Sequence, residues 1–221
     1  MPESTVPAKT LPQFKPATAE HKEIVENTYF GSLTSRKITK ARYCQLENGI
    51  VRLASNEKEY GFIPAIIGTA EKQLTIMLNT YGKIFAIRFD FKVSEYTSNN
   101  EPISKFLSAF SKQLKRKHSV NDLGYTWARE LERAKKQHYH FLFFVDSKAI
   151  TSNEFTKLAT ATAKAATGAC SHIPEKPFTL VEINDSNAKL EVLERAMYLA
   201  KSRGKFYKNR QAKNYGSSRI K

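Results

Sequence analysis

The chain has few cysteines, few acidic residues and no long apolar run. Its only cysteines, Cys44 and Cys170, are far apart, so they form neither a disulfide framework nor a zinc-finger spacing. No stretch of about eighteen apolar residues occurs, which excludes a membrane-spanning helix. Residues 1–20 lack the basic and then apolar regions of a signal peptide. These absences predict a cytoplasmic protein with no membrane contact.

The shortage of acids leaves a large positive charge. The 221 residues hold 36 Lys and Arg against 21 Asp and Glu, a formal net charge of +15. Such an excess favours a polyanionic partner, most often nucleic acid, although a merely basic protein or one that touches anionic lipid would show it too. The hydrophobic share of 41% is that of a soluble globular protein with a core.

The composition divides the chain into four parts. Residues 1–20 contain four prolines and predict a flexible arm. Residues 21–69 are loosely helical and predict an N-terminal extension of unknown role, in which the apolar stretch 61–68 fits no element clearly. Residues 70–202 carry the strongest periodicity and predict the main domain. Residues 203–221 predict a basic tail with interleaved aromatic residues.

Hydrophobic periodicity within 70–202 predicts a mixed domain. Helical spacing marks 70–81, 102–117, 152–167 and 187–202, whereas alternation or aromatic runs mark strands at 83–93, 123–131, 138–145 and 178–183. This order predicts an α+β fold with a ferredoxin-like (RRM-like) antiparallel sheet and helices on one face. The other face of the sheet would then be free to hold a site.

Two histidines stand at the start of the apolar strand 138–145. His138 and His140 are two residues apart, so both side chains share one face of the strand. An antiparallel hairpin would bring Glu130 or Glu132 beside them, giving a metal three ligands and leaving coordination positions open for substrate. The alternative is that the histidines only end a strand and the acids are solvated hairpin charges.

The last helix holds a second group of reactive side chains. Glu194, Tyr198 and Lys201 follow one another three or four residues apart, so they can meet on one helical face. A tyrosine hydroxyl, with a pKa of about 10, is a poor nucleophile unless a cation or metal stabilises the phenolate. Lys201 could also hold a phosphate. Ordinary helix packing is the alternative.

The tail is typical of single-strand binding, because cations follow phosphates while aromatic faces accept unstacked bases. A solubilising tail is the alternative. The residues expected to contact nucleic acid are Arg203, Lys205, Tyr207, Lys208, Arg210, Lys213, Tyr215 and Arg219.

At these residues the chain resembles a known superfamily. His138-Tyr139-His140 resembles the His-hydrophobe-His motif of the HUH endonucleases, the segment 85–91 ("FAIRFDF") resembles their first motif, and 198–201 ("YLAK") resembles their Tyr-x-x-Lys motif. The segments 124–140 and 198–219 are similar to replication initiators of filamentous phages of the inovirus type. The resemblance covers residues 70–221 and implies an HUH endonuclease fold.

The resemblance implies a rolling-circle replication initiator of a phage, prophage or plasmid. Tyr198 would nick one strand and form a 5′-phosphotyrosine link, with Lys201 beside it. His138, His140 and Glu130, or less favourably Glu132, would bind Mg²⁺ or Mn²⁺. Arg88, in the first-motif segment, joins the residues expected to contact DNA. The resemblance also implies a bacterial host cell, with single-stranded DNA at a replication origin and a host helicase and polymerase as partners.

Glu194 departs from the two-tyrosine pattern, in which its position holds a first tyrosine. Some single-tyrosine plasmid initiators are similar in having glutamate there, which makes Glu194 a candidate general base for ending a replication round. Two other readings remain open. One is a non-catalytic single-stranded nucleic-acid-binding (RRM-like) protein, which would need neither the metal nor Tyr198. The other is a relaxase or transposase of the same chemistry.

Overall fold

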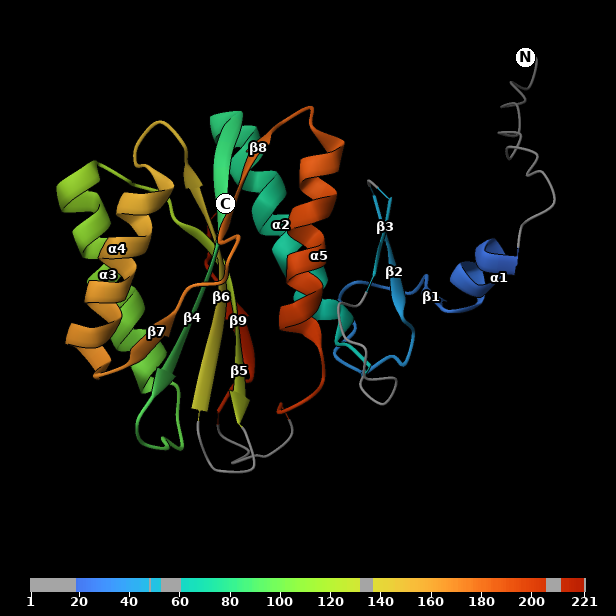
Figure 1. The fold of residues 1–221 in the computed structure, drawn as a ribbon, viewed down its shortest axis with the longest axis horizontal. Helices are drawn as coiled ribbons and strands as arrows, with labels where there is room; N and C mark the ends of the chain where they lie inside the picture. Colours follow the sequence, from blue (N-terminus) through green and yellow to red (C-terminus); the bar gives the residue numbers. More distant parts are fainter. Residues whose placement is uncertain (1–18, 48, 53–60, 132–136, 206–211, 221) are drawn as a thin grey trace, which may run out of the picture.

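A computed structural model describes residues 19–47, 49–52, 61–131, 137–205 and 212–220 (Figure 1). Helices and strands alternate along most of this length. In chain order the elements are α1 (Ala19–Glu26), β1 (Thr28–Tyr29), β2 (Tyr43–Leu46), β3 (Gly49–Arg52), α2 (Pro64–Tyr81), β4 (Lys83–Val93), α3 (Glu101–His118), β5 (Gly124–Leu131), β6 (Gln137–Asp146), α4 (Ser152–Thr167), β7 (Cys170–His172), β8 (Phe178–Glu182), α5 (Ser186–Ala200) and β9 (Tyr215–Ser217).

The main sheet is antiparallel, as the sequence predicts. Its strands lie in the order β7-β4-β6-β5-β9. β8 also pairs with β4, along residues 83–87, whereas β7 pairs with residues 90–92 of the same strand. The long central pair β4 and β6 aligns Ile84 with Asp146 at one end and Val93 with Gln137 at the other. The fold is therefore α+β, and every helix and strand expected between 70 and 202 is present with bounds shifted by a few residues.

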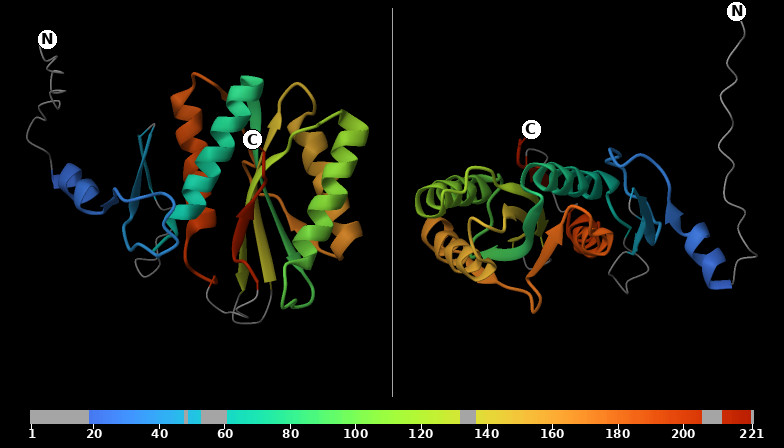
Figure 2. Two further views of the ribbon diagram at one scale, coloured as in Figure 1. Left: turned by 180° about the vertical axis from the view of Figure 1, so that it is seen from behind. Right: turned by 90° about the horizontal axis from the view of Figure 1, so that it is seen from above.

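Helices cover both faces of this sheet, which corrects the expectation of helices on one face. α3 and α4 lie on one face, and α2 and α5 lie on the other (Figures 1 and 2). The strand β6 explains why, because its apolar residues alternate between two cores. Leu142 and Phe144 pack with α2 and α5, whereas Phe141 and Phe143 pack with α3 and α4. A strand that is apolar at every position needs a cover on each side.

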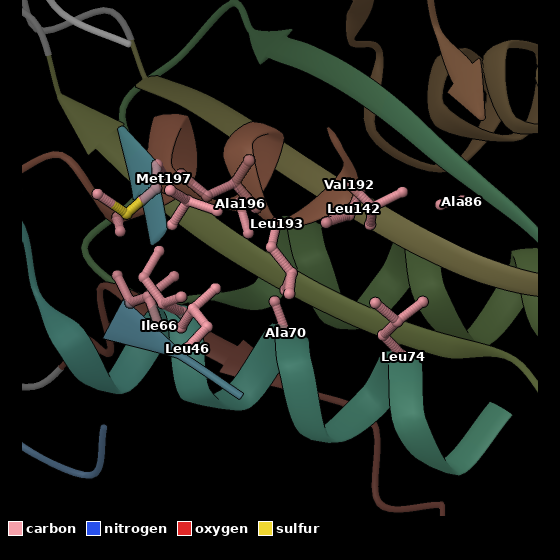
Figure 3. Packing of buried hydrophobic residues seen from close by; sticks show 14 of the residues in the cluster. Leu46, Ile66, Ala70, Leu74, Ala86, Leu142, Val192, Leu193, Ala196 and Met197 are labelled. Atoms are coloured by element: carbon pink, nitrogen blue, oxygen red, sulfur yellow. The ribbon is translucent and has the colours of Figure 1, made fainter. Parts of the chain in front are cut away.

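The core between α2, α5 and the sheet is aliphatic (Figure 3). Ile66, Ala70 and Leu74 of α2 face Leu193 and Met197 of α5, and all five are at least 98% buried. The helical spacing of the last helix predicts an apolar side made of Leu190, Leu193, Met197 and Ala200. The last three are fully buried, and Leu190 is partly buried against the same core. This packing fixes the rotation of α5, and with it the side of the helix on which Tyr198 lies.

Residues 19–63 differ from the helical extension that the sequence suggests. Among the described residues of this range, only α1 is helical, and it stands away from the main body in Figure 1. A small sheet, with β1 parallel and β3 antiparallel to β2, packs through Cys44 and Val51 against the α2–α5 core. The unassigned stretch 61–68 is the start of α2 and the segment before it.

The segment before α2 secures the C-terminal end of α5. The Ile63 N–H donates to the Ala200 carbonyl at 2.9 Å, and the Ser202 N–H donates to the Gly61 carbonyl at 2.8 Å. A side chain at Gly61 would lie 1.8 Å from the Thr39 carbonyl oxygen, so only glycine allows this approach. The last turn of α5 is thereby held by a segment from the opposite end of the chain.

The tail is also partly ordered into the fold. Residues 215–217 form β9, which pairs with β5 at the edge of the main sheet, with Tyr215 opposite Ala128. The predicted boundary at residue 202 therefore does not separate the domain from its tail. Among the described residues, no helix combines the length and the hydrophobicity needed to cross a membrane.

Candidate functional site

The predicted metal ligands lie on the sheet face that α2 and α5 cover. Glu130 of β5 stands directly opposite His138 of β6, as the hairpin prediction required. His140 stands opposite Asp90 of β4. Since residues two apart share a face, Arg88 lies on the same face as Asp90. Three neighbouring strands thus bring two acids, two histidines and an arginine together.

His140 lies at the centre of this group. Its Nδ1 atom is 3.0 Å from Oδ2 of Asp90, and its Nε2 atom is 3.4 Å from Oε2 of Glu130. The His140 side chain is only 7% exposed. The ring of His138 lies beside that of His140, with centroids 6.5 Å apart and planes at 25°. One imidazole therefore sits between two carboxylates in a site that is largely closed to water.

The charges of the group shift one another's pKa. Burial opposes the charged form of His140, but Asp90 and Glu130 outweigh it and raise the pKa of the imidazole. Burial also opposes the charge of Glu130, yet the hydrogen bond to His140 and the charges of Lys205, His140 and Lys201 lower its pKa to about 2. Without a metal, the site is held together by a protonated imidazole between two carboxylates.

This arrangement predicts a loss of stability at alkaline pH in EDTA. Because the pKa of His140 is raised above its usual 6.5, its contribution is complete below that value and is lost as the pH rises through the folded pKa. Glu130 contributes above its usual pKa of 4.5 and stops contributing only as the pH falls towards about 2. As the pH rises above 6.5, the melting temperature should therefore fall more for the wild type than for His140→Gln. Parallel curves for the two proteins would contradict this reading.

Tyr198 lies over the same group. It is on the last turn of α5, and its ring centroid is 5.4 Å from that of His140, with the two planes nearly perpendicular. The guanidinium carbon of Arg88 is 3.9 Å from the Tyr198 ring centroid, and Nζ of Lys201 is 3.6 Å from it. α5 ends at Ala200, and Lys201 follows in an extended conformation. The end of the helix thus brings the tyrosine into contact with two cations and with His140.

Asp90 is the residue whose role the sequence reasoning missed. Arg88, which the sequence predicts to contact DNA, has its guanidinium paired with Asp90 at 2.8 Å and lies against the tyrosine ring. Asp90 had no role assigned, although it contacts both Arg88 and His140. A signal was present, because two opposite charges two residues apart in an otherwise apolar strand point to a pair on one face.

The other predicted residues are scattered around this group. Glu194 is exposed on α5, one turn before Tyr198. Arg203, Lys213 and Arg219 are exposed, and Tyr215 is partly buried in β9. Lys205 is only 1% exposed and does not fit a role in following phosphates at the surface. The remaining predicted residues lie outside the described part of the chain: Glu132, Tyr207, Lys208 and Arg210.

Two imidazoles and one carboxylate are donors that divalent cations accept, but the site is not assembled around a cation. Within the described ranges, no three His, Cys, Asp or Glu side chains form a group that could hold a metal. Neighbouring ligand atoms of an octahedral cation lie about 3 Å apart. His140 Nε2 and Glu130 Oε2 are 3.4 Å apart, which is close to that spacing. His138 is next to them on the same face. A metal ion would therefore require these side chains to rearrange around it.

Comparison with known proteins gives the family. No curated protein and no solved structure matches the chain. The sequence model of one family, the YagK/YfjJ C-terminal domain, matches residues 47–218. The match begins in the small N-terminal sheet and ends just beyond β9, so it includes the whole main sheet, α2 to α5 and the group of residues around His140 and Tyr198. The chain therefore belongs to the YagK/YfjJ C-terminal domain family.

Proposed function

We propose that the protein is a metal-dependent endonuclease that nicks and rejoins single-stranded DNA through Tyr198, as an HUH-type initiator of rolling-circle replication. The observation that carries this proposal is the contact of Tyr198 with His140, with Arg88 and Lys201 against the tyrosine ring. A nucleophile, two cations and two histidines meet at a covered sheet face. The net charge of +15 supports a polyanionic substrate.

The topology supports an HUH-type fold of the ferredoxin-like kind. The elements β4-α3-β5-β6-α4-β8 follow a β-α-β-β-α-β order, and their strands lie side by side as β8-β4-β6-β5. α3 and α4 lie together on one face, as that arrangement requires. α2 and α5 are additions on the opposite face, and α5 supplies the tyrosine.

The reaction is a transesterification. The phenolic oxygen of Tyr198 forms a bond to phosphorus while the bond from phosphorus to the 3′ oxygen breaks. The phenol loses its proton and the leaving 3′ oxygen gains one. The products are a 5′-phosphotyrosine and a free 3′-hydroxyl, from which a host polymerase can extend after a host helicase opens the duplex. Attack by a 3′-hydroxyl on the phosphotyrosine reverses the step and rejoins the strand.

The chain's own residues bind and orient the phosphate. The guanidinium of Arg88 and the ammonium of Lys201 flank the tyrosine, where they meet the negative charge of a phosphate next to it. Asp90 fixes the guanidinium by a hydrogen bond of 2.8 Å. His138, His140 and Glu130 would hold Mg²⁺ or Mn²⁺, which supplies Lewis-acid polarisation of the scissile phosphate when bound.

The test of this proposal is a covalent adduct. Protein incubated with labelled single-stranded origin DNA and Mn²⁺ should give a band that stays shifted on a denaturing gel, and EDTA should abolish it. Tyr198→Phe should form no adduct, because it lacks only the nucleophilic oxygen. Tyr43→Phe, with its tyrosine in β2 of the small sheet, is the matched control and should retain the adduct. DNA binding without an adduct on any strand tested would favour a non-catalytic nucleic-acid-binding protein.

Glu194 is expected to act at the end of a replication round and not at its start. It is exposed one turn before Tyr198, so its carboxylate can reach a water molecule beside the phosphotyrosine without being needed for the first attack. Glu194→Gln is expected to nick at the wild-type rate but to hydrolyse or resolve the adduct about 10²-fold more slowly. Adduct lifetime on a suicide oligonucleotide measures this. Equal losses in nicking and resolution would remove Glu194 from the mechanism.

A further inference from the structure

Lys205 is the most deeply buried cation near the site, although the sequence predicts it in a DNA-binding tail. Its side chain is 0% exposed. Nζ lies 2.8 Å from Oε1 of Glu130 and donates to the Lys201 carbonyl oxygen at 2.5 Å. Burial lowers the pKa of Lys205, and the carboxylate of Glu130 opposes that shift. A buried ammonium with these two partners is part of the site and cannot follow phosphates at the surface.

The backbone around Lys205 is built to deliver this ammonium to Glu130. Gly204 has a φ of +73°, and a side chain there would lie 3.3 Å from the Glu130 Cβ atom. The Leu131 N–H donates to the Gly204 carbonyl at 2.9 Å, which joins the segment to the edge of β5. On its other side, the Asn214 side chain donates to the Lys205 carbonyl. Glycine therefore permits a close approach that hydrogen bonds from two directions maintain.

The two oxygens of Glu130 consequently have different surroundings. Oε1 binds Lys205, whereas Oε2 faces Nε2 of His140 at 3.4 Å and Nζ of Lys201 at 3.8 Å. Only Oε2 is directed towards the histidines. A carboxylate whose second oxygen is held by a fixed donor presents one oxygen in one direction, which is how outer hydrogen bonds orient metal ligands.

We propose that Lys205 is a positioning residue that holds Glu130 as a one-oxygen ligand of the divalent cation. This inference rests on the proposed function, because it concerns the same metal site. It assigns Lys205 to metal binding in place of DNA binding. Replacing Lys205 should therefore change metal binding, whereas replacing Lys213, an exposed lysine of the same tail, should change DNA binding.

The first measurement is the Mn²⁺ affinity of the DNA-free protein, read from the electron paramagnetic resonance signal of free Mn²⁺. Lys205→Met, which keeps the aliphatic stem, should weaken Mn²⁺ binding by about 10- to 100-fold, the usual effect of losing an outer-shell partner. Excess Mn²⁺ should then restore adduct formation to near the wild-type rate. Lys213→Met should leave Mn²⁺ affinity unchanged. Should Lys205→Met fail to fold, Lys205→Gln retains a donor for Oε1 and should show a smaller loss of the same kind.

The second measurement is DNA affinity in EDTA over a series of salt concentrations. A lysine that contacts a phosphate reduces the salt slope by about 1 when it is removed. Lys213→Met should show that reduction, and Lys205→Met should not. Unchanged Mn²⁺ affinity in Lys205→Met, or a salt slope reduced as in Lys213→Met, would overturn the role proposed for Lys205. A wild-type protein that binds no Mn²⁺ would instead overturn the metal site itself, and this inference with it.

Discussion

Replacing His140 with alanine is expected to reduce the rate of adduct formation by about 10³-fold, because electrostatic groups at a reacting phosphate each contribute several kcal/mol to the transition state. Among the described residues, only the His140 imidazole contacts both carboxylates and the tyrosine: Asp90 at 3.0 Å, Glu130 at 3.4 Å and the Tyr198 ring at 5.4 Å between centroids. Its loss removes a proposed metal ligand and a contact that orients the proposed nucleophile.

The fold should survive this replacement. Asp90 keeps its pairing with Arg88 at 2.8 Å, and Glu130 keeps Lys205 at 2.8 Å, so neither buried carboxylate is left without a cation. Single-turnover nicking and Mn²⁺ binding should both fall, while the circular dichroism spectrum stays that of the wild type. His118→Ala, at the far end of α3, is the matched control and should change neither quantity. A rate within threefold of wild type for His140→Ala would exclude its role as a ligand.

The parts of the site that could be predicted depend on local spacing. His138 and His140 share a face because they are two residues apart on a strand, and Glu130 meets them because a short hairpin joins β5 to β6. Such relations follow from the period of a strand and the register of a hairpin. Tyr198 and Lys201 also meet as expected, although Lys201 lies beyond the end of α5.

The parts that could not be predicted depend on how distant elements pack. Arg88 reaches Tyr198 only because α5 covers the face of β4 on which Arg88 lies. Lys205 reaches Glu130 only because the chain after α5 turns back along β5. No spacing in the sequence encodes either approach. The covered second face was signalled by the apolar run of β6, but periodicity alone does not say which helices cover which side.

The aromatic core on the other face explains why the histidine strand is rigid. Tyr139, Phe141 and Phe143 alternate with the site residues of β6 and are all fully buried between the sheet and α3 and α4. The rings of Phe141 and Phe143 pack against Phe106 of α3, with centroids 5.4 Å and 6.3 Å away. Tyr139 packs against Phe91, which also contacts Phe106. The direction of the imidazoles on one face thus depends on packing on the opposite face.

Phe106→Ala should accordingly lower the free energy of unfolding by about 3–5 kcal/mol, the usual cost of removing a buried aromatic ring. Phe106 is fully buried and packs against the rings of Phe89, Phe91, Phe110, Phe141 and Phe143. A domain of ordinary stability, about 5–15 kcal/mol, would lose a large part of its margin. Urea denaturation measures the change through the midpoint and slope of the transition.

Phe178→Ala is the matched control for this experiment. Phe178 is 44% exposed on β8, and its ring contact is with Phe85 at 5.6 Å between centroids. Its replacement should cost less than about 1 kcal/mol, because little apolar area leaves the protein interior. If the two variants lose equal stability, the aromatic cluster is not the core that supports β6. The expected outcome is that only Phe106→Ala loses stability, and that it still binds Mn²⁺ like the wild type at urea concentrations well below its unfolding midpoint. The aromatic cluster then supports the strand, and the reacting groups lie on the other face, beneath α5.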